Sequence, residues 1–268
     1  MLVDTHCHLT MTATYKSDIN NAVILSEITK IYDEATRMHV TKIIDVGTTL
    51  NESILATQCA LQHDNIYAAI GIHPCDLQQN WLNDIALLND LYQKTPPQKI
   101  VAIGECGIDL YHQPANLTQQ KDAFYAHIEL ALQHRLPVIV HSRNAAEETL
   151  TCIDRYRNDN LRGVMHCFSY DTSIAHEVIQ RKFVLGIGGT ITYPKNNELR
   201  SLIQSLQLEH IVLETDAPFL PPQPWRGQKN YPHHIHYIAK YIAQLRNETF
   251  EQIAAQTTHN AVKLFNLL

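Results

Sequence analysis

The sequence predicts an α/β fold, a (β/α)8 TIM-type barrel built as a single domain over residues 1–268. Eight short runs rich in β-branched residues recur along the chain, with 3.6-residue apolar spacing between them. Strands that alternate with helices favour a parallel sheet, and eight such strands close a barrel. The length of 268 residues and the 45% hydrophobic content suit one barrel domain of ordinary size.

Each element is expected at a definite place. The strands are predicted over residues 2–6, 42–47, 66–72, 100–105, 138–141, 163–166, 183–187 and 210–216. Among the helices, one is predicted over 118–135 with Thr118 as its N-cap, and the last over 260–268. A doubly wound open sheet is the rival fold, and it would carry a glycine-rich phosphate loop after its first strand. That place holds Thr5-His6-Cys7-His8-Leu9, which favours the barrel.

Charge and cysteine content argue against a broadly basic nucleic-acid-binding protein and against a disulfide-rich one. A net charge of -6 argues against a broad basic surface for nucleic acid, so a polyanion would need a local patch or metal ions. None of the six cysteines forms a C-x-x-C pair, which favours reduced thiols and a cytoplasmic location. The amino terminus does not have the pattern of a signal peptide, and no apolar run approaches the roughly 20 residues of a membrane helix. We therefore expect no association with a membrane.

Five of the eight predicted strands end in residues that commonly bind metals. These are His6 and His8, Glu105, His141, His166 and Asp216. The active site of such a barrel lies at the carboxyl ends of its strands, so these residues should meet around one axis. Alternation along a strand directs His6 and His8 to the same side and turns Cys7 away from them. Cys106 and Cys167, which also follow candidate ligands, are expected to face the helices.

The number of donors indicates how many ions they hold. Six nitrogen and oxygen donors exceed what one tetrahedral zinc takes and suit two divalent ions joined by a carboxylate. We expect Glu105 to be that bridge, because a carboxylate offers two oxygens. Asp216 would bind one ion and orient a metal-activated hydroxide or receive its proton. Asp4 and Glu214 are candidates for supporting the ligands, and the ions would be Mg²⁺, Mn²⁺ or Zn²⁺.

Cations and aromatic residues should surround the mouth of the barrel. Four cations follow strand ends, namely Arg143, Lys195, Arg226 and Lys229. The same loops carry Phe168, Tyr170, Tyr193, Phe219, Trp225 and Tyr231. Cations with aromatic rings suit phosphate contacts and base stacking. The alternative is that these aromatic rings pack on each other and the cations pair with nearby acids.

Read in order, these residues resemble the TatD family of metal-dependent deoxyribonucleases, a branch of the amidohydrolase-like barrels. The matching motifs are Val3-Asp4-Thr5-His6-Cys7-His8-Leu9, Gly71-Ile72-His73-Pro74, Gly104-Glu105-Cys106-Gly107-Ile108-Asp109, Val140-His141-Ser142-Arg143, His166-Cys167-Phe168-Ser169, Glu214-Thr215-Asp216-Ala217-Pro218 and finally Asn260. They span essentially the whole chain. Thr10 and Asn230-Tyr231-Pro232 depart from the family pattern, which usually has an acidic residue and Asn-Glu-Pro at those places. Both departures lie outside the six candidate ligands.

The resemblance implies a hydrolase of DNA phosphodiester bonds, a 3′-5′ exodeoxyribonuclease on single-stranded ends that uses two divalent ions. By the family pattern, one ion would be held by His6, His8, Glu105 and Asp216, and the other by Glu105, His141 and His166. His73 and Arg143 match positions that contact substrate phosphate. DNA is then the expected partner, and no obligate protein partner is expected.

Two other functions remain open from the sequence. The first is an amide, lactone or other ester hydrolase on the same barrel, because a metal-activated hydroxide also attacks carbonyl groups. Many barrels of that kind bridge their metals with a carbamylated lysine, whereas the fourth strand of this chain offers Glu105. The second is a metal-binding protein with little catalysis, which would not require an open mouth lined by cations.

Overall fold

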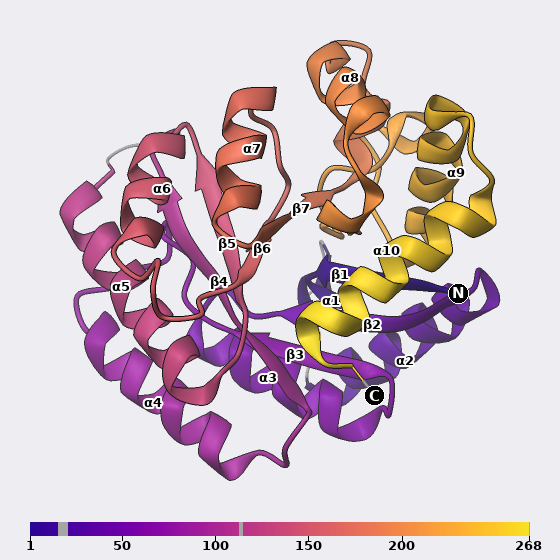
Figure 1. Ribbon diagram of the computed structural model, residues 1–268. Helices are drawn as coiled ribbons and strands as arrows, with labels where there is room; N and C mark the ends of the chain where they lie inside the picture. The colour runs from indigo at the N-terminus through magenta and orange to yellow at the C-terminus, as the bar shows by residue number, and fades with distance from the viewer. Residues whose placement is uncertain (16–20, 113–114, 268) are drawn as a thin grey trace.

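A computed structural model describes residues 1–15, 21–112 and 115–267 of the chain (Figure 1). Its eight strands form one parallel sheet in the order β1 to β8, so neighbours in sequence are neighbours in space. The strands are β1 (Leu2–Cys7), β2 (Val40–Val46), β3 (Ile66–Ile70), β4 (Ile100–Asp109), β5 (Val138–Arg143), β6 (Gly163–Met165), β7 (Phe183–Ile187) and β8 (Ile211–Leu213). The predicted (β/α)8 barrel is confirmed.

Helices connect successive strands and pack against the outside of the sheet, as α3 to α7 do in Figure 1. The α-helices are α1 (Leu9–Thr14), α2 (Asn21–Arg37), α3 (Leu50–Gln62), α4 (Trp81–Lys94), α5 (Leu117–His134), α6 (Ala146–Asp154), α7 (Thr172–Gln180), α8 (Asn197–Ser205), α9 (Ile235–Arg246) and α10 (Phe250–Phe265). Short 3₁₀ helices are η1 (Gly189–Thr192), η2 (Leu208–His210), η3 (Gln223–Trp225) and η4 (Pro232–His234). None of the helices in the described residues is both long enough and apolar enough to cross a bilayer.

The barrel closes between β8 and β1 at the carboxyl ends of these strands. The amide of Asp216 donates to the carbonyl of His6 at 2.8 Å, and the amide of His8 donates to Ala217 at 2.7 Å. Asp4 reinforces the seam, because its two carboxylate oxygens accept from the amide and the hydroxyl of Thr215 at 2.9 and 2.6 Å. Closure therefore brings the first and last candidate ligands of the chain together.

Two apolar cores stabilise the barrel. One lies between the sheet and its helices, and it contains Cys7 and Cys106, as predicted for both thiols. The other lies inside the barrel, where Val3, Ile44 and Val212 belong to it. Helix α10 packs at the amino ends of the strands and contributes Ala261, Leu264 and Phe265 to the same core. With α10 packed into this core, the polar residues of the interior collect at the opposite, carboxyl end of the strands.

Several predicted boundaries were wrong. Helix α5 begins at Leu117 and is capped by Asn116, whose side chain accepts from the Gln119 amide, and not by Thr118. Helix α10 begins ten residues earlier than expected, after the cap Thr249, and the predicted end at Leu268 lies outside the described residues. Both caps precede the first turn by one residue, which is where a side-chain oxygen reaches free backbone amides.

Strand β4 is longer than predicted and continues past Glu105 to Asp109. The extension pairs with β5, where Gly107, Ile108 and Asp109 lie beside His141, Ser142 and Arg143. Glu105 consequently lies within its strand and not at the end. Since side chains alternate along a strand, Asp109 returns to the face that Glu105 occupies.

Candidate metal centre

The fold gathers all six predicted ligands, here called the central cluster, at the carboxyl ends of the strands. Its members are His6 from β1, His8 just after it, Glu105 from β4, His141 from β5, His166 directly after β6, and Asp216 after β8. His6, His8, Glu105, His166 and Asp216 are buried, and His141 is partly buried. Residues more than 200 positions apart in the chain thus form one polar group above an apolar core.

Glu105 lies at the middle of the central cluster. Its Oε2 is 3.3 Å from His6 Nε2 and 3.8 Å from His8 Nε2. Its Oε1 is 2.9 Å from His141 Nδ1 and 3.9 Å from His166 Nε2. Each oxygen therefore faces a different pair of imidazoles, which is the arrangement that a bridging carboxylate requires.

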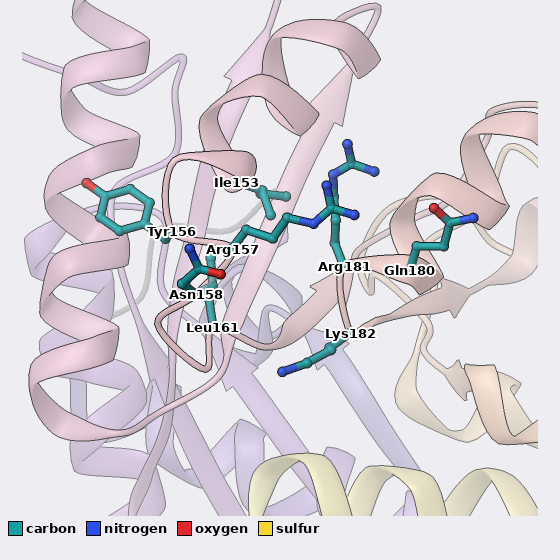
Figure 2. A pocket seen from close by; sticks show the side chains of 8 residues that line it. All are labelled: Ile153, Tyr156, Arg157, Asn158, Leu161, Gln180, Arg181 and Lys182. Carbon is teal, nitrogen blue, oxygen red and sulfur yellow. The ribbon is translucent and has the colours of Figure 1, made fainter.

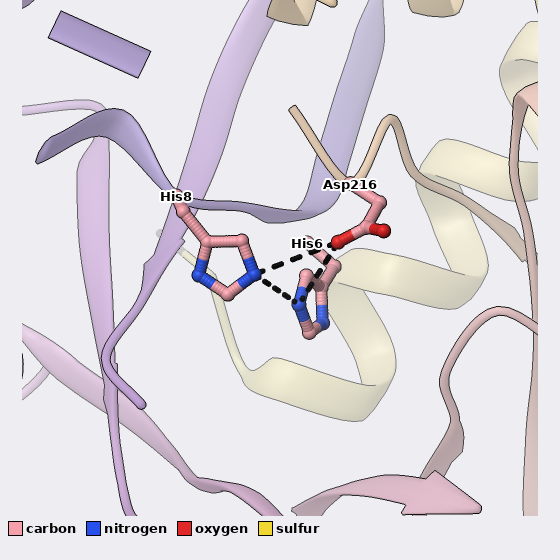
Figure 3. A group of neighbouring side chains, drawn as sticks. All are labelled: His6, His8 and Asp216. Atoms are coloured by element: carbon pink, nitrogen blue, oxygen red, sulfur yellow. Dashed lines mark hydrogen bonds and ion pairs between the residues drawn. The ribbon is translucent and has the colours of Figure 1, made fainter. Parts of the chain in front are cut away.

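Asp216 faces the deepest imidazoles of the cluster. Its Oδ1 is 3.5 Å from His8 Nε2 and 3.8 Å from His6 Nε2, and these three side chains point toward one another in Figure 3. His166 Nε2 is also 3.8 Å from the same oxygen. The Nε2 atoms of His6 and His8 are only 3.2 Å apart. Such convergence of nitrogen and oxygen donors suits a divalent cation with mixed histidine and carboxylate ligands.

Burial and mutual contact shift the pKa values of these groups. Burial opposes ionisation of Glu105, but the imidazoles of His6 and His166 hold its pKa well below its usual range. Burial likewise opposes the charged form of His166 and of His8, yet neighbouring carboxylates raise their pKa values to about 10 and about 9. Without a metal ion, protons on imidazoles compensate the buried carboxylates. A divalent cation can replace those protons, so the donor set fits such an ion.

Outer contacts orient the imidazoles. Glu214 Oε1 lies 3.0 Å from His166 Nδ1, and Asp109 Oδ2 lies 2.9 Å from His141 Nε2. His8 Nδ1 lies 2.8 Å from the carbonyl of Val46. In each case the second ring nitrogen is held from outside, which directs the first one into the cluster.

Room for Glu214 comes from Gly186, because any Cβ at that position would collide with the Glu214 carboxylate. Glu214 also accepts from the amide of Cys167 at 2.6 Å. The predicted outward orientation of Cys167 was wrong, since its thiol lies within 4.8 Å of donor atoms of His166 and Glu214. Strand β6 ends at Met165 and Cys167 has a φ of 46°, so strand alternation does not reach it.

Five of the six residues of the cluster, all except His6, line a hollow of about 420 Å³, here called the carboxyl-end hollow. His73 and Arg143, the predicted substrate contacts, both line it. His73 Nε2 is 3.8 Å from Glu105 Oε1, and burial lowers the pKa of His73 to about 4. The guanidinium carbon of Arg143 lies 3.8 Å from the centre of the Tyr111 ring. A cation and an exposed aromatic ring therefore stand together at the mouth.

Other loop residues predicted to surround the mouth are placed differently in the structure. Phe168 is 1% exposed and belongs to the apolar core between the sheet and its helices. Its ring packs edge-on against Tyr170. Arg226 lies over Tyr193 at 4.7 Å, and Lys229 lies over Tyr231 at 4.7 Å. Lys229 contacts a ring of its own loop and Arg226 a ring of another loop, whereas the alternative expected these cations to pair with acids.

Asp109, Tyr111 and His112 were missed as neighbours of the cluster. Asp109 accepts from the amides of Tyr111 and His112 at 2.9 and 2.8 Å, in addition to its contact with His141. The sequence did contain a signal for Asp109. This residue follows Glu105 by four positions, and alternation along a strand places both side chains on one face. Recognising it required knowing that β4 continues beyond Glu105.

A second hollow lies at the amino ends of β6 and β7 and is here called the amino-end hollow (Figure 2). Its volume is about 250 Å³. Its lining residues are Ile153, Tyr156, Arg157, Asn158, Leu161, Gln180, Arg181 and Lys182. Arg181 is bound to Asp154 and to Glu177 at 2.6 Å each. No histidine or carboxylate lines this hollow, so it offers no set of ligands for a metal ion.

Comparison with known proteins agrees with the geometry. A family model described as TatD related DNase matches residues 3–266. The uncharacterized metal-dependent hydrolase YabD of Bacillus subtilis is 34% identical over the full length of both chains. YcfH of Escherichia coli, also named an uncharacterized metal-dependent hydrolase, is 30% identical and covers 99% of this chain and 96% of its own. The crystal structure of YjjV, a TatD homologue from Escherichia coli, superposes with a TM-score of 0.88 at 29% identity, covering 100% of this chain and 98% of that one. This chain belongs to the TatD family of metal-dependent hydrolases.

Proposed function

We propose that the protein hydrolyses DNA phosphodiester bonds as a 3′-5′ exodeoxyribonuclease acting on single-stranded ends. The observation that carries this proposal is that Arg143 and His73 line the same hollow as five residues of the central cluster. A guanidinium beside buried carboxylates and imidazoles suits a substrate that is anionic at its reacting centre. The description of the matching family, TatD related DNase, supports the same class of substrate.

Two divalent ions would occupy the central cluster. His6, His8, Glu105 and Asp216 would hold one, and Glu105, His141 and His166 the other, in keeping with the imidazole pairs that face the two oxygens of Glu105. When bound there, Mg²⁺, Mn²⁺ or Zn²⁺ supplies Lewis acidity, which lowers the pKa of a water molecule and offsets phosphate charge. The choice among these ions depends on availability, because mixed histidine and carboxylate donors accept each of them.

The residues of the chain have separate tasks in the reaction. Burial opposes ionisation of Asp216, but His8 and His166 lower its pKa, so its carboxylate is charged at neutral pH and can accept a proton from the attacking water. The water oxygen bonds to phosphorus, the bond from phosphorus to the 3′ oxygen breaks, and that oxygen is protonated from solvent. Glu105 keeps the two halves of the cluster at a fixed spacing while this occurs.

Arg143 and His73 would hold the phosphate. The planar guanidinium of Arg143 can donate two parallel hydrogen bonds to phosphate oxygens. Nδ1 of His73 accepts from the Cys75 amide at 3.2 Å, so the neutral ring carries its proton on Nε2 and can donate it to an oxygen. Tyr111 and Phe219 are 56% and 47% exposed at the mouth, where a terminal base could stack on them.

An amide, lactone or other ester hydrolase is the alternative. The floor of the hollow would serve a carbonyl substrate equally well, and Met11, Phe219 and Leu220 give part of the lining an apolar character. The guanidinium at the mouth favours phosphate over an uncharged ester. We further propose a one-domain protein that works without an obligate partner and is cytoplasmic, and the six free cysteines support the last of these points.

The test is a digestion of single-stranded DNA labelled at its 5′ end, with Mg²⁺, Mn²⁺ or Zn²⁺ added to chelator-treated protein. The proposal expects a ladder that shortens stepwise from the 3′ end and is lost when Asp216→Asn replaces the wild type. Arg143→Lys keeps the charge but not the paired hydrogen bonds, so it should raise KM more than it lowers kcat. No digestion with any of the metals, together with turnover of a lactone or amide panel, would favour the alternative.

A further inference from the structure

Beside the central cluster lies a second convergence of ligand-type side chains, here called the mouth group. It consists of His73 and Cys75 from the loop after β3, Asp109 at the end of β4, and His112 from the turn that follows β4. Donor atoms of His73, Cys75 and Asp109 all lie within 4.8 Å of one another. His112 Nδ1 is 3.0 Å from Asp109 Oδ2 and 3.8 Å from Cys75 Sγ. Two of these four side chains, Cys75 and His112, play no part in the hydrolysis proposed above.

We propose that the mouth group binds one thiophilic divalent cation such as Zn²⁺ beside the central cluster, with His73 then serving as a ligand and not as a phosphate contact. The donor set of one sulfur, two imidazole nitrogens and one carboxylate oxygen is of the kind that zinc takes in tetrahedral coordination. With zinc–sulfur and zinc–nitrogen bonds of about 2.3 and 2.0 Å, ideal tetrahedral edges are roughly 3.6 Å for S···N and 3.3 Å for N···O. The observed 3.8 and 3.0 Å lie close to these values. Cys75, His112 and Asp109 therefore already lie at distances that suit a common ion, and His73 lies within 4.8 Å of Cys75 and Asp109.

Charge at the mouth group favours a cation. The carboxylates of Asp109 and Asp76 both lie near Cys75, and Asp109 accepts from the amides of Tyr111 and His112. Burial together with the carboxylates of Asp109 and Asp76 raises the pKa of the Cys75 thiol to about 11, against a smaller opposite effect of Arg143. The same negative potential that disfavours a free thiolate attracts a cation, and a bound cation would stabilise the thiolate.

The proposed ion differs in type from those of the central cluster. That cluster offers only nitrogen and oxygen, which accept Mg²⁺ and Mn²⁺ readily, whereas the sulfur of Cys75 selects softer ions. Access is direct, because Cys75 and His112 are exposed side chains. Asp109 Oδ2 also lies 2.9 Å from His141 Nε2, so an ion in the mouth group shares its carboxylate with a residue of the central cluster. The chain would thus hold a soft ion next to its hydrolytic centre, and the contact between Asp109 and His141 would link the two sites.

Cobalt spectroscopy tests the proposal without any substrate. Chelator-treated protein is titrated with Co²⁺, and the near-ultraviolet charge-transfer band that reports a sulfur-to-cobalt bond is recorded for wild type, Cys75→Ser and Cys167→Ser. Cys167 is the matched control, because its thiol lies near His166 and Glu214 on the other side of the cluster. The proposal expects the band in wild type and in Cys167→Ser, and its loss in Cys75→Ser. Equilibrium dialysis should then show one Zn²⁺ fewer per chain for Cys75→Ser.

A second variant distinguishes loss of the ion site from misfolding of the protein. His112→Gln keeps the thiol, so the band should persist at saturation while the Co²⁺ affinity that it reports falls at least about tenfold. Thermal unfolding of each variant, measured without metal, should match that of the wild type. A saturated wild type without the band, or a band that survives Cys75→Ser, would overturn the proposal. Because none of these readouts involves DNA, their failure would leave the proposed nuclease activity untouched.

Discussion

The two ends of this barrel use charged residues in opposite ways. At the carboxyl ends of the strands, Glu105 and Asp216 are buried among imidazoles and face a hollow of about 420 Å³. At the amino ends, Arg181 is neutralised by Asp154 and Glu177 next to a hollow of about 250 Å³. Buried charges that depend on an exchangeable ion indicate function, whereas charges satisfied by fixed partners indicate stability. Substitutions at the two ends should separate these two roles.

The largest effect is expected from Glu105→Gln. The amide keeps the shape of the side chain but removes the charge that faces the four imidazoles of the central cluster, so ion binding in both halves of the cluster should fail. We expect at least about a thousandfold loss of hydrolysis, beyond the 10–100-fold usual for residues that only orient a ligand. Metal content and kcat/KM of the variant provide the measurement. If the variant still bound two ions per chain, Glu105 would not be the bridging ligand.

The loop that carries His73 depends on a buried histidine and should give the protein a pH-sensitive stability. His127 of α5 donates from Nδ1 to the Ala123 carbonyl at 2.7 Å, and its Nε2 accepts from the Ile72 amide at 3.0 Å. Burial lowers its pKa to about 4 from the 6.5 of an unperturbed imidazole. The unfolded chain therefore binds this proton first, and stability falls as the pH drops from 6.5 toward 4.

That difference in pKa corresponds to about 3 kcal/mol at most. The free energy of unfolding, measured by denaturant titration between pH 7 and 4, should fall less steeply for His127→Gln than for wild type. Other groups contribute equally to both proteins and cancel in the difference. Identical slopes would contradict a neutral, buried His127.

A smaller effect is expected from Glu214→Gln, which weakens the contact that orients His166. Metal affinity or activity should fall by about 10–100-fold, in the range of outer contacts to a metal-bound imidazole. A matched control is Asp45→Asn, because Asp45 is also a buried acid near the carboxyl ends but accepts from the Leu9 amide and not from a ligand imidazole. If both variants lose affinity equally, Glu214 contributes only to packing.

The smallest effect on activity is expected at the amino ends. Arg181→Ala should cost about 1–2 kcal/mol of stability, since it leaves Asp154 and Glu177 without their partner. Hydrolysis by the folded variant should stay within about twofold of the wild type. Lys182→Ala, in the same hollow, should change the stability by less than about 0.5 kcal/mol. Loss of activity in either folded variant would contradict the division of roles between the two ends.

Much of this arrangement was predictable because a barrel imposes its own geometry. His6, Glu105 and Asp216 are far apart in the chain, yet residues near the carboxyl ends of parallel strands must meet around one axis. Ligand-type residues at those places sufficed to predict that they converge. The assignment of His6 and His8 to one ion and of His141 and His166 to the other came from the family resemblance alone.

The features that the sequence did not reveal depend on tertiary pairing. Strand β4 continues to Asp109 because β5 supplies partners as far as Arg143, and no local pattern records that pairing. Cys167 faces the cluster because the chain leaves the strand geometry after Met165. Phe168 follows Cys167 directly, and its buried ring packs edge-on against Tyr170. Alternation is a reliable guide only while a residue remains in a paired strand.

The most direct test of the account is an anomalous difference map from crystals grown with Mn²⁺. The account predicts two peaks that share Glu105, one next to His6, His8 and Asp216, and the other next to His141 and His166. A map without peaks in the central cluster, or with a single peak that does not contact Glu105, would contradict it.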